Sequence, residues 1–394
     1  MNLHVLTPEV QRYLTEHAHT APATLALRKS PFTAVTAAEL AQQLDGRQRC
    51  RKKMPLWYDT PGIYYPEKLS IEQASSQITA SHKAGIVPEG SHVIDLTGGF
   101  GVDTIFFAQR AKAVTHCETN TALSEIASHN ASVLGAANST FIAADGTGYL
   151  ENLPDNTFNV AYIDPSRRVA QRKVFRLEDC VPNVIAIQHG LLQSASKIII
   201  KSAPLLDIAA ALQALECVSA VHIISTGNEC KELLFVVDRG HTGEPQRIAT
   251  ALTMDAAAVS FSFTLSEEQT ANPAFGYPTG YLYEPDAALL KAGAFKLIGT
   301  RYGLNKLHRH THLYTANQPH VDFMGKTFRI TDVMGYGDFK KSKATRQGNV
   351  STRNFPLNAE ALRQRHRIGE ADDRHLFFCT GPNEELLVIF ASKC

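Results

Sequence analysis

The chain has 394 residues, of which 44% are hydrophobic and 20% charged, and its formal net charge is +1, so its composition is that of an ordinary globular protein. No apolar run approaches the roughly 20 residues of a membrane-spanning helix, and the first residues lack the basic start and apolar core of a signal peptide. Seven cysteines occur without a Cys-x-x-Cys pair, which argues against structural zinc and a disulfide framework, so we expect a cytoplasmic protein without a structural metal.

Residues 1–88 are predicted to form an N-terminal helical region. Thr7 is expected to cap a first helix, and the capping-box spacing within 36–44 predicts a second helix that ends near its last residue. A basic cluster follows at 47–53. The segment 70–80 is predicted to be one helix that leads into the first strand.

The stretch 92–104 is the most informative part of the chain. An apolar strand ends in Asp95, and the turn after it contains three glycines within four residues: Gly98, Gly99 and Gly101. Glycines let the backbone approach a ligand closely, and the start of the following helix offers free N–H groups to a negative group on that ligand. The stretch therefore predicts a site for a nucleotide-like cofactor, although the G-x-G-x-x-G spacing of nicotinamide and flavin enzymes is absent.

Three further predicted strands each end in an acidic residue. They are 113–117 followed by Glu118, 141–144 followed by Asp145 and Gly146, and 158–163 followed by Asp164 and Pro165. Ligands of an open α/β sheet bind at the carboxyl ends of its parallel strands, so all of these acids are expected at one edge. An acid in the position of Glu118 can accept both ribose hydroxyls of a nucleoside, and Asp145 is placed to accept an adenine amino group.

The loop 165–178 is rich in cations. It contains five within ten residues: Arg167, Arg168, Arg172, Lys173 and Arg176. Because they directly follow the fourth strand, we favour contact with substrate phosphates over a purely solvated loop. Strands at 197–201, 218–225 and 232–237 complete a mostly parallel sheet, the last two as an antiparallel hairpin.

The pattern changes after residue 245. Two short strands are predicted within 248–265, around Asp255, and 272–280 is a predicted hinge rich in turn-forming residues. Beyond it we expect helices at 284–293 and 359–367 and strands at 328–333, 348–353, 375–380 and 385–391. This α+β region has no series of acid-ended strands, so we expect no second catalytic site.

The C-terminal region carries an excess of positive charge. Residues 296–394 contain 16 Lys and Arg against 9 Asp and Glu, whereas the rest of the chain contains 23 against 29. A one-sided basic region is typical of a protein that binds RNA, although a solvated face without a ligand can carry the same charges. The alternation of His308, His310 and His312 predicts one face of a strand, and we expect a basic surface there rather than a metal site.

The series of motifs resembles the class I S-adenosylmethionine-dependent methyltransferases. Residues 95–101 resemble the first motif of that family, and the acids that end the next three strands resemble its second, third and fourth motifs. The resemblance implies a Rossmann-like, seven-stranded sheet and S-adenosylmethionine as the cofactor. The residues then expected to bind the cofactor are Asp95, Thr97, Gly98, Gly99, Gly101, Asp103, Glu118, Thr119, Asp145, Gly146 and Asp164. Thr97 stands where the family most often has glycine.

Two short segments and the C-terminal region resemble one bacterial group within this family. That group has an Asp-Pro-Ser-Arg-Arg fourth motif, present at 164–168, and a Glu-Gln-x-Ser-Ser segment, present at 72–76. The resemblance implies an N-terminal helical region at 1–88, a methyltransferase domain at 89–240, a small ferredoxin-like domain at 275–320 and a THUMP-like α+β domain at 321–394. THUMP domains are associated with RNA-modifying enzymes.

The fourth motif bears on the chemistry. Enzymes that methylate base amines commonly have an acid or Asn followed by Pro-Pro and an aromatic residue, and only Asp164 and Pro165 preserve this pattern. Because this first half of the pattern is preserved, we favour methylation of a base amine. The expected catalytic residues are Asp164, Pro165 and Ser166, and the expected substrate contacts are Arg167, Arg168, Arg172 and Lys173. A covalent route needs a cysteine just past the fifth strand, where 201–204 has none, and Cys180 is expected to pack against a helix.

The sequence as a whole predicts an S-adenosylmethionine-dependent methyltransferase that acts on RNA. Two alternatives remain open. The loop cations could instead bind the carboxylates or phosphates of an anionic small molecule that is methylated. The chain could also be an RNA-binding protein that binds the cofactor without catalysis.

Overall fold

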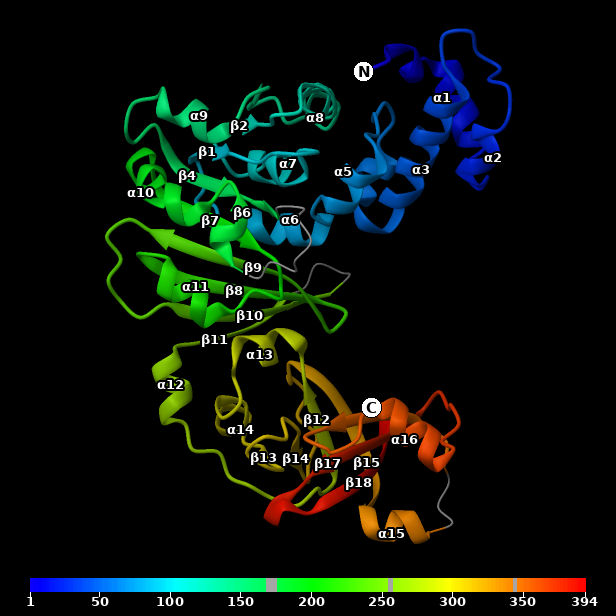
Figure 1. Cartoon of the computed structure of the whole chain (residues 1–394), viewed down its shortest axis with the longest axis vertical. Helices are drawn as coiled ribbons and strands as arrows, with labels where there is room; N and C mark the ends of the chain where they lie inside the picture. The colour runs from blue at the N-terminus through cyan, green and yellow to red at the C-terminus, as the bar shows by residue number, and fades with distance from the viewer. Residues whose placement is uncertain (168–175, 254–257, 343–345) are drawn as a thin grey trace. The chain divides into compact units, whose positions relative to one another are not determined.

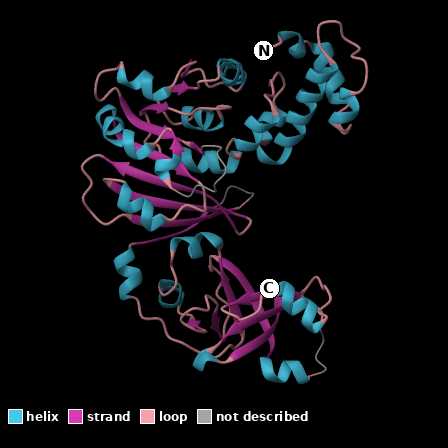
Figure 2. Ribbon diagram, in the orientation of Figure 1, coloured by secondary structure: helices cyan, strands magenta, loops and turns pink. Residues whose placement is uncertain are grey.

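The computed structural model describes residues 1–167, 176–253, 258–342 and 346–394 (Figure 1). The chain divides into two compact units, which are Met1–Ser219 with Leu233–Gly243 and Ala220–Glu232 with Glu244–Cys394. Both units combine strands with helices (Figure 2), which confirms the predicted α/β class. Within the described ranges, no helix is long and apolar enough to cross a membrane.

The first unit begins with a helical region, as predicted. Its elements are η1 (Leu3–Leu6), α1 (Pro8–Glu16), α2 (Pro22–Ala26), α3 (Ala37–Lys53), α4 (Pro55–Asp59), α5 (Lys68–Gln73) and α6 (Gln77–Ala84). The capping box of Thr36 and Glu39 opens α3. That helix continues to Lys53 rather than ending near residue 44, because the basic cluster contains no helix-breaking residue. Thr7 is the N-cap residue of α1, as predicted, but its side chain makes no capping hydrogen bond.

The predicted single helix over 70–80 is also wrong. Two helices, α5 and α6, are separated by Ala74, Ser75 and Ser76. The hydroxyl of Ser76 accepts a hydrogen bond from the N–H of Thr79 and so caps α6. Serine in this position competes with helix continuation, which explains the break.

Seven strands match those predicted for the first sheet. They are β1 (His92–Asp95), β2 (Ala113–Cys117), β3 (Ser139–Ile142), β4 (Phe158–Ile163), β7 (Ala195–Ser202), β8 (Val218–Thr226) and β9 (Glu229–Asp238). In the first unit the order is β9-β7-β4-β1-β2-β3. All of these are parallel to their neighbours except β9, which is antiparallel to β7. The strands β8 and β9 are neighbours in the sheet.

The helices of the first sheet and the short elements near it follow the same chain order. They are α7 (Val102–Ala108), α8 (Thr121–Val133), α9 (Gly146–Glu151), β5 (Ser166–Arg167), η2 (Leu177–Asp179), β6 (Cys180–Val181), α10 (Val184–Ser194) and α11 (Ile208–Ala214). Helices α7, α8 and α10 pack against β2, β3 and β7, respectively, and α6 packs against α7. Buried aliphatic residues of β1, β4 and β7 form the core between these layers.

The second unit extends the hairpin of β8 and β9 with two of its own strands. These are β10 (Gln246–Leu252), parallel to β8, and β11 (Ala258–Phe263), antiparallel to β10. They correspond to the pair predicted within 248–265, whereas Asp255 lies outside the described residues.

A second sheet fills the rest of that unit, in the order β13-β14-β12-β15-β18-β17-β16. Its strands are β12 (Tyr281–Pro285), β13 (Asn305–Lys306), β14 (Tyr314–Ala316), β15 (Gly325–Gly335), β16 (Asn349–Arg353), β17 (Arg374–Thr380) and β18 (Leu386–Lys393). The helices are α12 (Leu265–Thr270), α13 (Ala287–Ala292), α14 (Leu297–Tyr302), α15 (Tyr336–Lys341), α16 (Ala359–His366) and η3 (Pro382–Glu384). Two apolar clusters contain alternate residues of β17, so both faces of the sheet are covered.

Two predictions in this region need correction. The helix expected over 284–293 begins later, because β12 extends to Pro285 and Asp286 then caps α13. His308 and His312 do not lie on a strand. His308 is buried beside Glu384, and the ring of His312 stacks on Phe295 at 3.9 Å. The local spacing could not reveal these partners, which come from elsewhere in the chain.

Candidate active site

The glycine loop, residues 97–101, joins β1 to α7 at the carboxyl end of the first sheet. The N–H of Gly98 donates to Cys117 O at 2.9 Å, and the N–H of Gly101 donates to Gly98 O at 2.9 Å. Gly99 and Gly101 have φ values of +55° and +83°, in the left-handed region that favours glycine. The loop is therefore a tight turn fixed by its own backbone.

The side of the loop that faces the core has no room for side chains. A Cβ on Gly98 would lie 2.2 Å from the ring of His116, whereas a Cβ on Gly99 would meet only Thr97 O, at 3.9 Å. The ring of His116 is fully buried on β2, and burial lowers its pKa to about 4. His116 was not predicted as a site residue, because its place in a buried strand was the only signal available.

Glu118 follows β2 and faces the glycine loop. Its Oε2 accepts a hydrogen bond from the N–H of Gly99 at 3.0 Å. Its Oε1 accepts from the N–H of Asn120 at 2.7 Å and from the hydroxyl of Thr119 at 3.3 Å. Glu118 is thus held next to the loop, as the ribose-binding role requires.

Asp95 contacts the glycine loop from the buried side. Its side chain is buried and accepts hydrogen bonds from the N–H of Thr97 at 3.2 Å and from the hydroxyl of Thr104 at 2.8 Å. Burial, together with the nearby charge of Asp103, raises the pKa of Asp95 to about 7. The structure therefore places this predicted cofactor-binding residue under the loop, with both oxygens engaged by protein.

Asp103, in the first turn of α7, belongs to a buried network. Lys83 Nζ lies 3.0 Å from its Oδ1, and the hydroxyls of Ser75 and Tyr162 both donate to its Oδ2 at 2.8 Å. Burial would raise the pKa of Asp103, but the ammonium groups of Lys83 and Lys201 and these hydrogen bonds outweigh it, so the pKa is lowered. Asp103 connects α6 and β4 to the start of α7 rather than to the open side of the loop.

Asp145 and Gly146 lie where β3 turns into α9. Asp145 is exposed and caps α9 by accepting from the N–H of Gly148 at 2.9 Å. Hydrogen bonds from the side chain of Thr147 and from Gly148 lower the pKa of Asp145. A Cβ on Gly146 would lie 2.5 Å from Leu96 O, so only glycine lets this turn approach the end of β1.

Asp164 follows β4 and is tied to the opposite side of the glycine loop. Its N–H donates to Thr97 Oγ1 at 2.7 Å. Its Oδ2 pairs with Lys201 Nζ at 2.5 Å, and the Asp164 side chain is 34% exposed. The structure therefore brings together the glycine loop, Glu118 and Asp164, whereas Lys201 was not predicted as a site residue. An apolar strand that ends in a cation beside an acid-ended strand was the available signal.

Residues beyond Asp164 are only partly described. Pro165 is half-buried and Ser166 is exposed, with its hydroxyl donating to Val181 O at 3.3 Å. The strand β5, which contains Ser166 and Arg167, pairs with β6. The predicted substrate contacts Arg168, Arg172 and Lys173 lie outside the described residues.

Cys180 lies in the short strand β6. The β5–β6 pairing places its backbone opposite Arg167, and its thiol donates to Arg176 O at 3.6 Å. A short antiparallel pair, which local patterns did not indicate, therefore returns the chain toward the end of β4.

The N-terminal helical region borders this site through Lys53 at the end of α3. Its Nζ donates to Ile71 O at 2.8 Å and to Glu72 O at 2.7 Å, the carbonyls of α5. Burial and then the positive charge of Lys201 lower the pKa of Lys53. Helices far from the sheet in sequence therefore contribute a cation near the end of β7.

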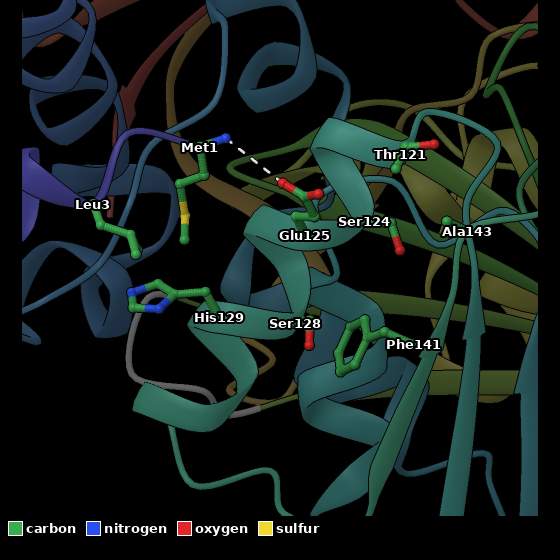
Figure 3. A pocket seen from close by; sticks show the side chains of 9 residues that line it. All are labelled: Met1, Leu3, Thr121, Ser124, Glu125, Ser128, His129, Phe141 and Ala143. Carbon is green, nitrogen blue, oxygen red and sulfur yellow. Dashed lines mark ion pairs between the residues drawn. The ribbon is translucent and has the colours of Figure 1, made fainter.

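A separate hollow of about 540 Å³ lies on α8 and β3 (Figure 3). It is lined by Met1, Leu3, Thr121, Ser124, Glu125, Ser128, His129, Phe141 and Ala143. Its described lining includes none of the predicted cofactor-binding residues. Within the parts of the chain that the structure describes, no three His, Cys, Asp or Glu residues gather as potential metal ligands.

The geometry around the glycine loop fits an adenosyl sulfonium cofactor. A Cβ-free face at Gly99 is open, and the carboxylates of Glu118 and Asp164 lie on opposite sides of the loop. Both carboxylates therefore stand at the carboxyl ends of parallel strands, the edge at which ligands of such sheets bind.

Comparisons with known proteins agree with this architecture. A ferredoxin-like domain model matches residues 281–323, and a THUMP domain-like model matches residues 325–392. No curated protein sequence matches the chain. A crystal structure described as a "putative methyltransferase" from Porphyromonas gingivalis W83 is 30% identical, with a TM-score of 0.89, over 99% of this chain and 98% of that chain.

Two other solved structures match only part of the chain. An rRNA methylase from Streptococcus thermophilus is 17% identical, with a TM-score of 0.31, over 42% of this chain and 98% of its own. SMU.1697c from Streptococcus mutans, also described as a "putative methyltransferase" and solved in complex with SAH, is 14% identical, with a TM-score of 0.30, over 42% of this chain and 99% of its own.

Proposed function

The chain belongs to the class I S-adenosylmethionine-dependent methyltransferases that carry ferredoxin-like and THUMP-like domains, and we propose that it methylates RNA at an exocyclic base amine. S-adenosylmethionine is the cofactor of this family. We also propose the division into a helical region at 1–88, a catalytic domain at 89–240, a ferredoxin-like domain at 275–320 and a THUMP-like domain at 321–394.

One observation supports the proposed chemistry most strongly: a partly exposed carboxylate stands at the end of β4, beside the glycine loop. The main chain of Asp164 is fixed by the Thr97 hydroxyl, and its Oδ2 is fixed by Lys201. An acid held at this point can accept an N–H of an amine and so aim the nitrogen lone pair at a methyl group. Pro165 and Ser166 would complete the wall beside the acceptor.

The cofactor, when bound, supplies an electrophilic methyl group on a sulfonium. Methyl transfer is an in-line displacement, in which the nitrogen–methyl bond forms as the sulfur–methyl bond breaks. The protein's contribution is therefore mainly to place the nucleophile within about 3 Å of the methyl carbon and in line with it. Asp164 would orient the amine, and the extra proton would pass from the nitrogen to solvent after transfer.

A route without a covalent cysteine intermediate is supported by the residues past β7. The chain there reads Ser202, Ala203, Pro204, without a thiol. Cys180 donates its S–H to a backbone carbonyl of its own loop, which is the arrangement of a structural thiol.

An RNA substrate is supported by positive charge on the second unit. The exposed cations of this unit include Arg309, Lys326, Arg329, Lys340 and Lys341. The match to a THUMP domain-like model agrees with this interpretation, because THUMP domains are associated with RNA-modifying enzymes. We also propose that Arg167 and the loop cations after it contact substrate phosphates.

The proposal is tested with total RNA from cells that lack the gene. Purified wild-type protein and the Asp164→Ala variant are incubated with tritiated S-adenosylmethionine, and modified nucleosides are identified by mass spectrometry. We expect the wild type to label one base amine and the variant to lose at least 100-fold in rate. Equal labelling by both proteins would refute the role of Asp164.

The salt dependence of RNA affinity, together with the molecules that receive the label, separates the two alternative functions from the proposed one. If RNA is the substrate, its affinity falls steeply between 50 and 200 mM salt because several phosphate contacts are lost. Label that appears only in small molecules would indicate an anionic metabolite as the acceptor. Cofactor and RNA binding without any label would indicate a non-catalytic RNA-binding protein.

A further inference from the structure

We propose that Lys201 is a positioning residue that holds the Asp164 carboxylate in the orientation needed by the methyl acceptor. This inference rests on the proposed function and deepens it, because it adds a residue that neither the motifs nor the comparisons assign. It also narrows the acceptor to a group that donates a hydrogen bond.

The register of the first sheet places the two side chains together. The parallel strands β4 and β7 pair Ile163 with Ile200, so the next residue of each strand is Asp164 or Lys201. Their side chains meet at 2.5 Å between Nζ and Oδ2. Lys201 is 13% exposed and Asp164 is 34% exposed, so the pair is covered on the lysine side and open on the aspartate side.

Lys201 lies among charges of both signs, and it pairs directly with Asp164. Burial and then the charge of Lys201 lower the pKa of Lys53, at the end of α3. The carbonyls of Ile71 and Glu72 satisfy Lys53 itself. The positive charges of Lys53 and Lys201 repel one another. The negative carboxylate of Asp164 offsets this repulsion, which favours its ion pair with Lys201.

The ion pair determines which carboxylate oxygen serves the substrate. Lys201 engages Oδ2, which leaves Oδ1 as the oxygen outside the pair. Thr97 fixes the backbone of the same residue, so neither the main chain nor the side chain can rotate freely. An oxygen acceptor held in this way selects an N–H donor such as a base amine, and a misplacement of about 1 Å can cost on the order of 100-fold in rate.

The test compares three variants on the same strand. Lys201→Met removes the ammonium, Lys201→Arg keeps a cation, and Lys197→Met is the matched control. Lys197 pairs with Asp238 at 2.5 Å but lies at the opposite end of β7. Rates are measured with tritiated S-adenosylmethionine and total RNA, and cofactor affinity is measured by calorimetry.

We expect Lys201→Met to lower kcat by about 10–100-fold while KM and calorimetric affinity for S-adenosylmethionine stay within twofold. Lys201→Arg should recover most of the rate, and Lys197→Met should leave it unchanged. In a double-mutant cycle, Lys201→Met should have little further effect in the Asp164→Asn background, because the two residues act as one unit.

Three results would overturn the proposal. These are a wild-type rate in Lys201→Met, an equal loss of cofactor affinity and kcat, and additive effects in the double mutant. The second of these would indicate a merely structural role. If the wild-type protein labels no RNA at all, the proposed function fails and this inference fails with it, whereas the other results leave the proposed function intact.

Discussion

Two lysine–aspartate pairs flank the glycine loop, and they differ in what surrounds them. Lys83 and Asp103 are 0% and 10% exposed, and the aspartate oxygens are shared among an ammonium and two hydroxyls. Lys201 and Asp164 are 13% and 34% exposed, and the aspartate keeps one oxygen outside the pair. Asp103, with both oxygens engaged by protein groups, is suited to support the loop, whereas Asp164 keeps one oxygen outside its ion pair that a substrate can use.

The largest expected effect in this comparison is on the buried pair. Lys83→Met removes the cation paired with the buried carboxylate of Asp103, which should cost about 3–5 kcal/mol of unfolding free energy. Urea denaturation measures this loss. The matched control is Lys197→Met, whose pair with Asp238 is more exposed and should cost no more than about 1 kcal/mol. Equal losses of unfolding free energy in the two variants would contradict the distinction between buried and exposed pairs.

The contribution of Asp95 to stability depends on pH. Its pKa of about 7 lies above the ordinary value of 3.8 for an aspartate, so between these values the folded state binds more protons than the unfolded state. The contribution of Asp95 to stability is therefore fully present below pH 4 and is lost as the pH rises toward 7, by roughly 2–4 kcal/mol. Denaturation of the wild type and Asp95→Asn at pH 5 and pH 8 isolates this dependence. At pH 8 the variant should be more stable relative to the wild type than it is at pH 5. A stability difference that is the same at both pH values would contradict this prediction.

The Gly98→Ala variant tests whether the glycine loop tolerates a side chain. The new Cβ would lie 2.2 Å from the buried ring of His116, so either the ring or the loop must move. Overpacking of this kind costs about 1–3 kcal/mol, and a displaced loop should also weaken cofactor binding. Thermal unfolding and calorimetry measure the two effects. Gly90→Ala is the control, because its Cβ would meet nothing within 4 Å, although its φ of +73° makes a small loss expected there too.

The smallest expected effect concerns stability at the open pair. Asp164→Asn should change the unfolding free energy by less than about 1 kcal/mol, because the pair is partly exposed to solvent. The same variant should nevertheless lose most of its methyl transfer. A loss of stability as large as that of Lys83→Met would mean that Asp164 is structural.

The sequence predicted the parts of the site that are local in the chain. The acids that end β1, β2 and β4 and the glycine turn can be recognised because each follows directly from its own strand. The supporting residues could not be predicted. Lys83, His116 and Lys201 come from separate elements, and only the packed structure brings them to the loop. The short pair of β5 and β6 was missed because two-residue strands have no periodicity to detect.

The central claim is that the glycine loop, with Glu118 and Asp164 on its two sides, binds S-adenosylmethionine. Calorimetric titration of the full chain with S-adenosylmethionine and with its demethylated product tests this directly, in the wild type and in Glu118→Ala. We predict one binding site in the wild type and at least tenfold weaker binding in the variant, about 1.4 kcal/mol, because the ribose would lose its acceptor. No binding by the wild type, or equal affinities in the two proteins, would contradict the account.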